Sequence, residues 1–110
     1  MSHKKYKVCI DACYACAIAC DHCASEDLKE TDVKMLGDCI SLDRECSAFC
    51  RAAAHVMSMG GQFSNYLCSL CAEVCDACAD ECEKHSHIEH CKACAIACRK
   101  CADECRKIID

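Results

Sequence analysis

The spacing of the cysteines is the feature that most limits the fold of this chain. Three runs repeat gaps of three and four residues, and a fourth region carries a sparser version of the same rhythm. Because an α-helix places residues three and four apart on one face, each run predicts a helix with a stripe of thiols, about 21 Å long where it holds five cysteines. The stripes are Cys9, Cys13, Cys16, Cys20 and Cys23; Cys39, Cys46 and Cys50; Cys68, Cys71, Cys75, Cys78 and Cys82; and Cys91, Cys94, Cys98, Cys101 and Cys105.

Four such stripes predict an all-α fold, an antiparallel up-down-up-down four-helix bundle with a cysteine-lined core, in a single domain covering residues 1–110. The chain has no proline and only 3 glycines, which suits helices joined by short connections. We expect the turn between the second and third helices at Gly60-Gly61. We expect the first helix from about residue 6 to the 25–29 region, the second over 31–57 with Thr31 as its N-cap, and the third over 62–84. The fourth helix is expected to run to about residue 107 and to open with a capping box formed by Ser86 and Glu89.

Antiparallel packing of four level helices stacks the stripes into five layers that use every cysteine. Leu36 and Asp43, both on the second helix, take the two positions that lack a thiol. From the end that bears the termini, the expected layers are Cys9/Cys50/Cys68/Cys105, Cys13/Cys46/Cys71/Cys101, Cys16/Asp43/Cys75/Cys98, Cys20/Cys39/Cys78/Cys94 and Cys23/Leu36/Cys82/Cys91.

The cysteine content, 18 of 110 residues, would ordinarily indicate a small secreted disulfide scaffold. Such scaffolds are rich in loops, whereas these cysteines keep helical phase. The basic residues 1–7 lead into Asp11 and further cysteines, with no apolar run typical of a secretory signal. We therefore expect a cytoplasmic protein, in which thiols stay reduced and many cysteines suggest metal binding.

Other function classes find little support in the sequence. The net charge of −5 is mixed along the chain, which argues against binding to nucleic acid, and we expect no membrane-spanning stretch. No catalytic Ser/His/Asp arrangement, phosphate loop or paired-carboxylate cleft emerges, so an enzyme is not expected. A thiol-redox enzyme would need one exposed cysteine of low pKa, and none stands apart from the rest.

Soft thiolates select Cu(I), Zn(II) and iron–sulfur clusters. Zinc takes about four ligands, and a buried tetrathiolate would keep two surplus negative charges, which is costly. Cu(I) can share bridging sulfurs, and each ion replaces one thiol proton, so about one Cu(I) per cysteine leaves the core near neutral. Charge balance therefore favours storage of many Cu(I) ions, with zinc or general soft-metal buffering as the alternative.

The chain resembles the bacterial copper storage proteins, which are cysteine-rich four-helix bundles. The resemblance covers nearly the whole chain and rests on the repeated C-x2-C and C-x3-C pattern, on the segment from Cys39 to Cys46, and on Lys84-His85-Ser86-His87 running into Cys91. It implies a homotetramer of the cytosolic branch that holds Cu(I) through thiolates inside each protomer. A copper donor or acceptor, either a chaperone or a low-molecular-weight thiol, is then an expected partner.

The two ends of the expected core differ. Beyond the terminal layer lie Tyr6, Ala53, Ser64 and Ile108, with Met57 one step further out, which together form a fairly apolar plug. At the other end the stripes run into Asp27, Asp32, His85 and His87, so we expect copper to exchange there with His85 and His87 as outer ligands. As auxiliary ligands we consider Asp43, which could instead orient a thiol or pair with Arg44, and His22 and His90.

Overall fold

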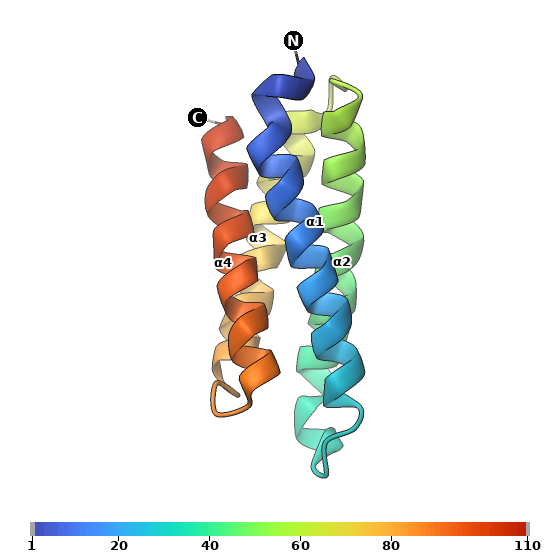
Figure 1. The fold of residues 1–110 in the computed structure, drawn as a ribbon, viewed down its shortest axis with the longest axis vertical. Helices are drawn as coiled ribbons and strands as arrows, with labels where there is room; N and C mark the ends of the chain where they lie inside the picture. The colour runs from blue at the N-terminus through green and yellow to red at the C-terminus, as the bar shows by residue number, and fades with distance from the viewer. Residues whose placement is uncertain (1, 110) are drawn as a thin grey trace.

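Four antiparallel helices form an elongated bundle that measures 48 × 19 × 17 Å, and the first helix begins at the same end of the bundle at which the last helix ends (Figure 1). This computed structural model describes the backbone of residues 2–109 and the side chains of residues 4–109. Helices α1 and α3 each pack against both α2 and α4, so the predicted up-down-up-down bundle is confirmed. The elements are α1 (Ser2–Asp27), the 3-10 helix η1 (Val33–Leu36), α2 (Gly37–Ser58), α3 (Ser64–Glu83) and α4 (Glu89–Ile109).

Three of the expected helix starts are wrong. Helix α1 begins at Ser2, about four residues before its expected start at residue 6. Helix α2 begins at Gly37, six residues after the expected Thr31 cap, because η1 occupies the intervening segment. Helix α4 begins at Glu89, so Glu89 lies in the first turn and the expected capping box with Ser86 does not form among the described residues. In its place, the His85 carbonyl accepts the Ile88 amide in the connecting turn.

The connection between α1 and α2 extends beyond the turn between α3 and α4 (Figure 1). It docks on the bundle through Leu36, whose side chain is buried. This longer connection sets the height of α2 relative to the other three helices, which matters for the metal centre below.

The turn between α2 and α3 lies at Gly60-Gly61, as predicted. Gly60 has φ 63°, a left-handed conformation that glycine adopts without steric cost. The Gly61 amide donates to the Val56 carbonyl at 3.0 Å, and the Gly60 amide donates to the Met57 carbonyl at 3.0 Å. This pair of bonds is the Schellman arrangement, which satisfies the last carbonyls of a helix. A Cβ on Gly61 would lie 2.7 Å from a Val56 methyl group, so both positions favour glycine.

Ion pairs on the outer surface join neighbouring helices. The Arg99 guanidinium on α4 contacts Asp76, Asp80 and Glu83 of α3 at 3.0, 2.6 and 2.8 Å, and Arg106 also contacts Asp76. Arg51 on α2 contacts Asp21 on α1 at 2.6 Å. Such exposed pairs contribute little individually, about 0–1 kcal/mol, so the core must supply most of the stability.

Helix α1 is more apolar than we expected, because one of its segments could span a membrane. By length and composition alone, its Lys4–Asp27 segment, with a mean hydropathy of 1.2, could cross a membrane. Half of its apolar window is buried inside the bundle, and buried cysteines and alanines fill that face. The core helix of a water-soluble bundle has the same composition, so this segment is weak evidence for a membrane span.

Candidate metal centre

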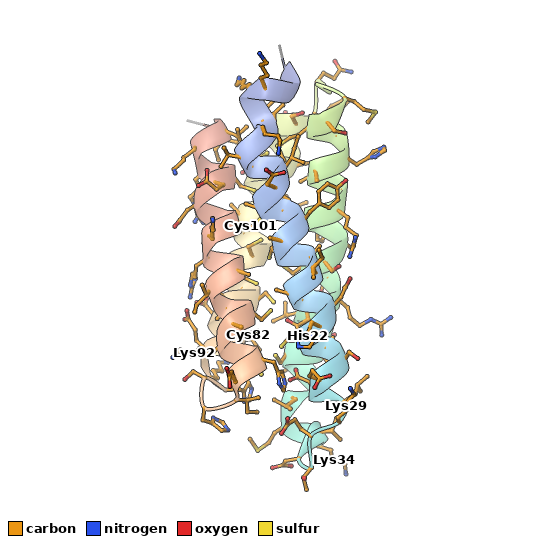
Figure 2. All side chains as sticks on the ribbon, viewed as in Figure 1. His22, Lys29, Lys34, Cys82, Lys92 and Cys101 are labelled. Carbon is orange, nitrogen blue, oxygen red and sulfur yellow. The ribbon has the colours of Figure 1, made fainter. Side chains whose placement is uncertain are left out.

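All of the cysteines point into the bundle, and none is more than 2% exposed. They form a column of sulfur along the long axis, with Cys101 in the upper part and Cys82 in the lower part of the view (Figure 2). Alanines such as Ala17, Ala79 and Ala102 are buried beside them and let the helices approach closely. The predicted cysteine-lined core is confirmed.

The sulfur atoms lie close together without being bonded. Cross-helix pairs such as Cys16–Cys98, Cys46–Cys75 and Cys39–Cys82 are 3.6 Å apart, and all the cysteines are free thiols. A disulfide needs sulfurs about 2.05 Å apart. A soft metal with metal–sulfur bonds of about 2.3 Å spans sulfurs up to about 4.6 Å apart. The spacing therefore suits thiolates that share metal ions.

The observed layers correct the predicted ones in one respect. On α1, α3 and α4 the expected cysteines do lie level, but α2 sits one layer further from the termini than predicted. The prediction assumed level helices and a short connection, whereas η1 and the residues before it carry α2 past the end of the other helices. The observed layers are Cys9/Met57/Cys68/Cys105, Cys13/Cys50/Cys71/Cys101, Cys16/Cys46/Cys75/Cys98, Cys20/Asp43/Cys78/Cys94 and Cys23/Cys39/Cys82/Cys91.

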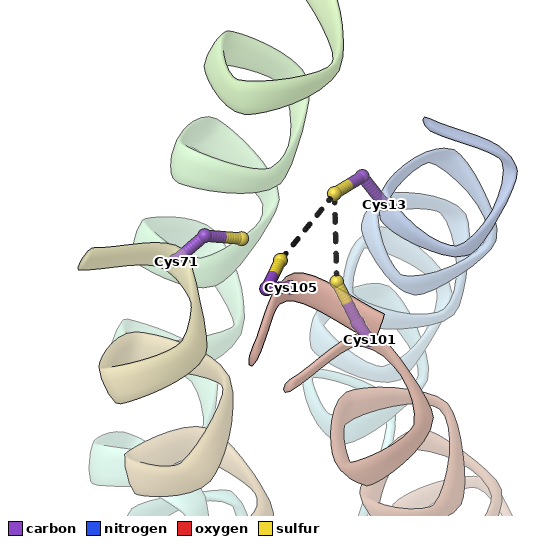
Figure 3. A group of neighbouring side chains, drawn as sticks. All are labelled: Cys13, Cys71, Cys101 and Cys105. Atoms are coloured by element: carbon purple, nitrogen blue, oxygen red, sulfur yellow. Dashed lines mark hydrogen bonds between the residues drawn. The ribbon is translucent and has the colours of Figure 1, made fainter. Parts of the chain in front are cut away.

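The thiols form a continuous string of potential metal sites. In each of five four-cysteine groups, all sulfurs lie within 4.8 Å of one another, and each group shares two cysteines with the next. Figure 3 shows the first of them, in which Cys13 lies 3.6 Å from Cys101 and 4.0 Å from Cys105. From the terminus end the groups are Cys13/Cys71/Cys101/Cys105, Cys50/Cys71/Cys75/Cys101, Cys16/Cys46/Cys50/Cys75, Cys16/Cys20/Cys46/Cys98 and Cys20/Cys78/Cys94/Cys98.

In the middle of the core, hydrogen bonds between neighbouring thiols shift their pKa values in opposite directions, so that those of Cys16 and Cys46 are lowered while others are raised. Hydrogen bonding to Cys16 and other neighbouring thiols raises the pKa of the Cys20 thiol, and burial raises it further. Hydrogen bonding to Cys101 and its neighbours, together with burial, does the same to the pKa of Cys50. A metal that binds thiols with a raised pKa must displace their protons, so loading the core releases them.

Asp43 interrupts the thiols in the fourth layer from the terminus end. Its side chain is fully buried and accepts hydrogen bonds from Cys78 at 3.2 Å, Cys94 at 3.4 Å and Cys39 at 3.8 Å. Burial, followed by the nearby Cys94 and Cys39 thiols, raises the pKa of Asp43 to about 9. Of the roles considered from sequence, orientation of thiols matches these contacts, while Arg44 points to solvent.

A second buried carboxyl group, Asp27, closes the end of the core opposite the termini. Its Oδ1 accepts a hydrogen bond from the Cys91 thiol at 3.3 Å and lies 2.8 Å from His90 Nε2. The Cys23 thiol lies 3.9 Å away. Burial raises the pKa of Asp27, and the contacts with His90 and Cys91 oppose that shift in part. Burial also raises the pKa of Cys91, and the Asp27 carboxyl raises it further.

The histidines named from sequence occupy different environments. His85 is buried, with Nε2 3.3 Å from the Glu81 carboxylate and Nδ1 without a hydrogen-bond partner. His87 is exposed and lines a shallow pocket with Asp32, Met35 and Leu36. His22 is also exposed, on the outer face of α1 in the lower half of the view (Figure 2). His90 is linked to the cysteine column through Asp27, whose Oδ1 contacts both His90 and the Cys91 thiol.

The opposite end carries apolar side chains. Tyr6, Ala53 and Met57 are buried and Ile108 is partly buried, as the predicted plug requires. Because α2 is displaced, Met57 lies level with the terminal cysteines and not beyond them. Its Sδ accepts a hydrogen bond from the Cys68 thiol at 3.5 Å.

Sequence reasoning did not select Asp27 or Met57 as site residues. The signal for Asp27 was present, because it follows Cys23 by four residues and so continues the α1 stripe. Met57 follows Cys50 by seven residues and continues the α2 stripe in the same way. Asp32, which we expected at the end of the column, is exposed instead. The buried Leu36 occupies that position.

Comparison with known proteins agrees with this geometry. The copper storage protein family model matches residues 2–110. A cysteine-rich protein of Bacillus subtilis, YhjQ, is 45% identical over 85 residues, which cover 77% of this chain and 78% of that protein.

Two solved structures share the fold closely. The Cu(I)-bound copper storage protein BsCsp3 of Bacillus subtilis is 43% identical, with a TM-score of 0.91 over 96% of this chain and 98% of that one. A cytosolic copper storage protein of Streptomyces lividans, with five coppers, is 37% identical, with a TM-score of 0.94 over 98% and 94% of the two chains. The chain belongs to the copper storage protein family.

Proposed function

We propose that this protein stores Cu(I) as its cargo, bound by thiolates along the core of the bundle. The observation that carries the proposal is the string of four-cysteine groups in which neighbouring groups share two sulfurs. Shared sulfurs suit bridged Cu(I), which binds with few ligands and replaces about one proton per thiolate. Isolated zinc sites would each need about four sulfurs of their own. The role is storage and release of the ion, with no chemical transformation by the protein.

An anaerobic Cu(I) titration of the fully reduced protein tests this proposal. A chromophoric Cu(I) chelator reports the endpoint, and the titration is repeated after loading with zinc. We expect an endpoint near one copper per cysteine, roughly 18 ions, with zinc displaced. An endpoint of a few ions, or zinc that copper does not displace, would support the alternative of a zinc-buffering protein.

Copper exchanges, in this proposal, at the end that carries the histidines. The core there ends in polar groups, Asp27, His85 and His90, whereas the opposite end is closed by apolar side chains. Imidazole nitrogen binds copper, and the unpartnered Nδ1 of His85 offers such a donor near the end of the column. The exposed His87 would meet incoming copper, and His90 would act through Asp27. His22, on the outer surface, is the weakest candidate.

We also propose a cytoplasmic location, a homotetramer, and copper exchange with a chaperone or a low-molecular-weight thiol. The reduced thiols of the core fit a reducing compartment, and the Streptomyces relative is described as cytosolic. Exposed apolar side chains, among them Met35, Phe63 and Leu70 near α2 and α3, provide surface that contacts between protomers would bury. We take residues 1–110 as one functional unit.

A further inference from the structure

The terminal layer of the core contains three thiols and one thioether. Cys9, Cys68 and Cys105 come from α1, α3 and α4, and the fourth helix, α2, contributes Met57. Cys9 and Cys105 are 3.7 Å apart, and Cys68 Sγ lies 3.5 Å from Met57 Sδ. The thiol–thioether distance therefore falls close to the thiol–thiol distances found elsewhere in the core.

Met57 is held in this position by the fold. Its side chain is 0% exposed, and its carbonyl accepts the Gly60 amide in the bond network that ends α2. The preceding turn of α2 carries Ala53 and Ala54, which are also buried and are too short to reach the centre of the layer. Met57 is thus the α2 side chain that completes the layer.

We propose that Met57 is a copper ligand, forming with Cys68 a mixed thiolate–thioether Cu(I) site at the terminus end, next to Cys9 and Cys105. A thioether is a soft donor that suits Cu(I). Cu(I) would replace the proton that Cys68 now donates to Met57, and that proton leaves to solvent with no change in the oxidation state of copper. Since the thioether carries no charge, the Met57–Cys68 pair binds one Cu(I) with no surplus charge.

A purely apolar role would require only volume. Methionine often fills irregular gaps in a core, and leucine has a similar volume. The sulfur of Met57 faces the Cys68 thiol, which a gap-filling side chain has no need to do. The two roles of Met57, gap filling and copper binding, therefore differ in whether copper binds to its sulfur.

The test uses selenomethionine-labelled protein loaded anaerobically with Cu(I), and X-ray absorption at both the selenium and the copper edges. We expect a copper neighbour at bonding distance from selenium in the unmodified sequence. That neighbour should disappear in Met57→Leu and remain in Met59→Leu, which changes a methionine that is 64% exposed. In the unlabelled variants, Met57→Leu should weaken the binding of one copper by roughly tenfold or more in chelator competition, while Met59→Leu should not.

This inference rests on the proposed copper storage, and the two can fail separately. Copper–sulfur neighbours at the copper edge with no copper neighbour at selenium would overturn the Met57 ligand and leave storage intact. Absence of copper uptake altogether would overturn storage itself. Unchanged copper retention in a well-folded Met57→Leu protein would also overturn the role of Met57.

Discussion

The two ends of the cysteine column are closed by different chemistry. At the terminus end, Met57, Tyr6 and Ile108 cover the last thiols with apolar groups. At the other end, the last thiols, Cys23 and Cys91, contact the carboxyl group of Asp27, which in turn contacts His90. An apolar cover holds the helices together and excludes water, whereas polar groups with nitrogen and oxygen donors can pass a metal ion between solvent and sulfur.

One repeating pattern of three- and four-residue gaps can therefore supply both the ligands along the core and the groups that close its two ends. Where the stripe continues as cysteine, the ligands are alike and can share ions. Where the cysteine stripe of a helix ends, the next residue on the same helix face closes that end of the core. This residue is Asp27 on α1 and Met57 on α2. The contrast between the two ends leads to the testable expectations that follow.

The largest expected effect is the pH dependence that the two buried carboxyl groups, Asp43 and Asp27, give to stability. The pKa of Asp43 is about 9 in the folded protein and that of Asp27 is also raised, so folding favours their protonated forms. Their contribution to stability is complete below the unfolded pKa of about 4 and is lost as pH rises through the folded pKa. Between about pH 5 and 8, Asp43 should lower the unfolding free energy of the metal-free protein by up to about 1.4 kcal/mol per pH unit.

Urea denaturation at several pH values, under reducing and anaerobic conditions, measures this slope. Asp43→Asn should remove most of it, and Asp27→Asn a smaller part. A slope that persists unchanged in the double variant would show that other groups govern the pH dependence.

The next effect concerns the apolar end. Met57→Ala removes a fully buried side chain and should cost about 2–5 kcal/mol of unfolding free energy in the metal-free protein. Met59→Ala, two residues later on the exposed surface, should stay within about 0.5 kcal/mol of the parent. Urea denaturation compares the two variants. Equal losses would mean that the terminus end is not packed as described.

Copper exchange should depend on the polar end. Replacing His85 and His87 together with alanine should slow loading and chelator-driven removal by roughly tenfold, since donors near a metal site typically change its properties by that factor. His55→Ala is the matched control, because His55 is exposed in the last turn of α2, at the terminus end. Stopped-flow absorbance of Cu(I)–thiolate formation gives the rates. Unchanged rates in the double variant, or equal slowing in the control, would refute exchange at the histidine end.

The smallest effect tests the turn that fixes Met57. Gly60→Ala forces alanine into a conformation with φ 63° and should cost about 1 kcal/mol of unfolding free energy. Copper loading rates should remain those of the parent, because the turn lies away from the histidines. Thermal unfolding with and without copper measures the loss, and an unchanged melting temperature would argue against a strained turn.

Much of this molecule follows from local sequence rules. The gaps of three and four residues place every cysteine on one face of a helix, and the absence of proline and the Gly60-Gly61 pair set the number and order of helices. Helical periodicity depends only on near neighbours in the chain, so it can be read from sequence. The buried column, the soft-metal chemistry and the relative levels of α1, α3 and α4 were predicted for that reason.

The height of α2 could not be predicted, because it depends on how the segment between Asp27 and Gly37 folds. That segment forms η1 and docks Leu36 on the bundle, a tertiary contact that no local pattern specifies. The displacement moves Asp43 level with Cys78 and Cys94, and it brings Met57 to Cys68. Helical periodicity is enough to show which residues face the core. Which of those residues contact one another depends on the packing of the helices, because a helix can slide by one turn along its neighbours and keep the same buried face.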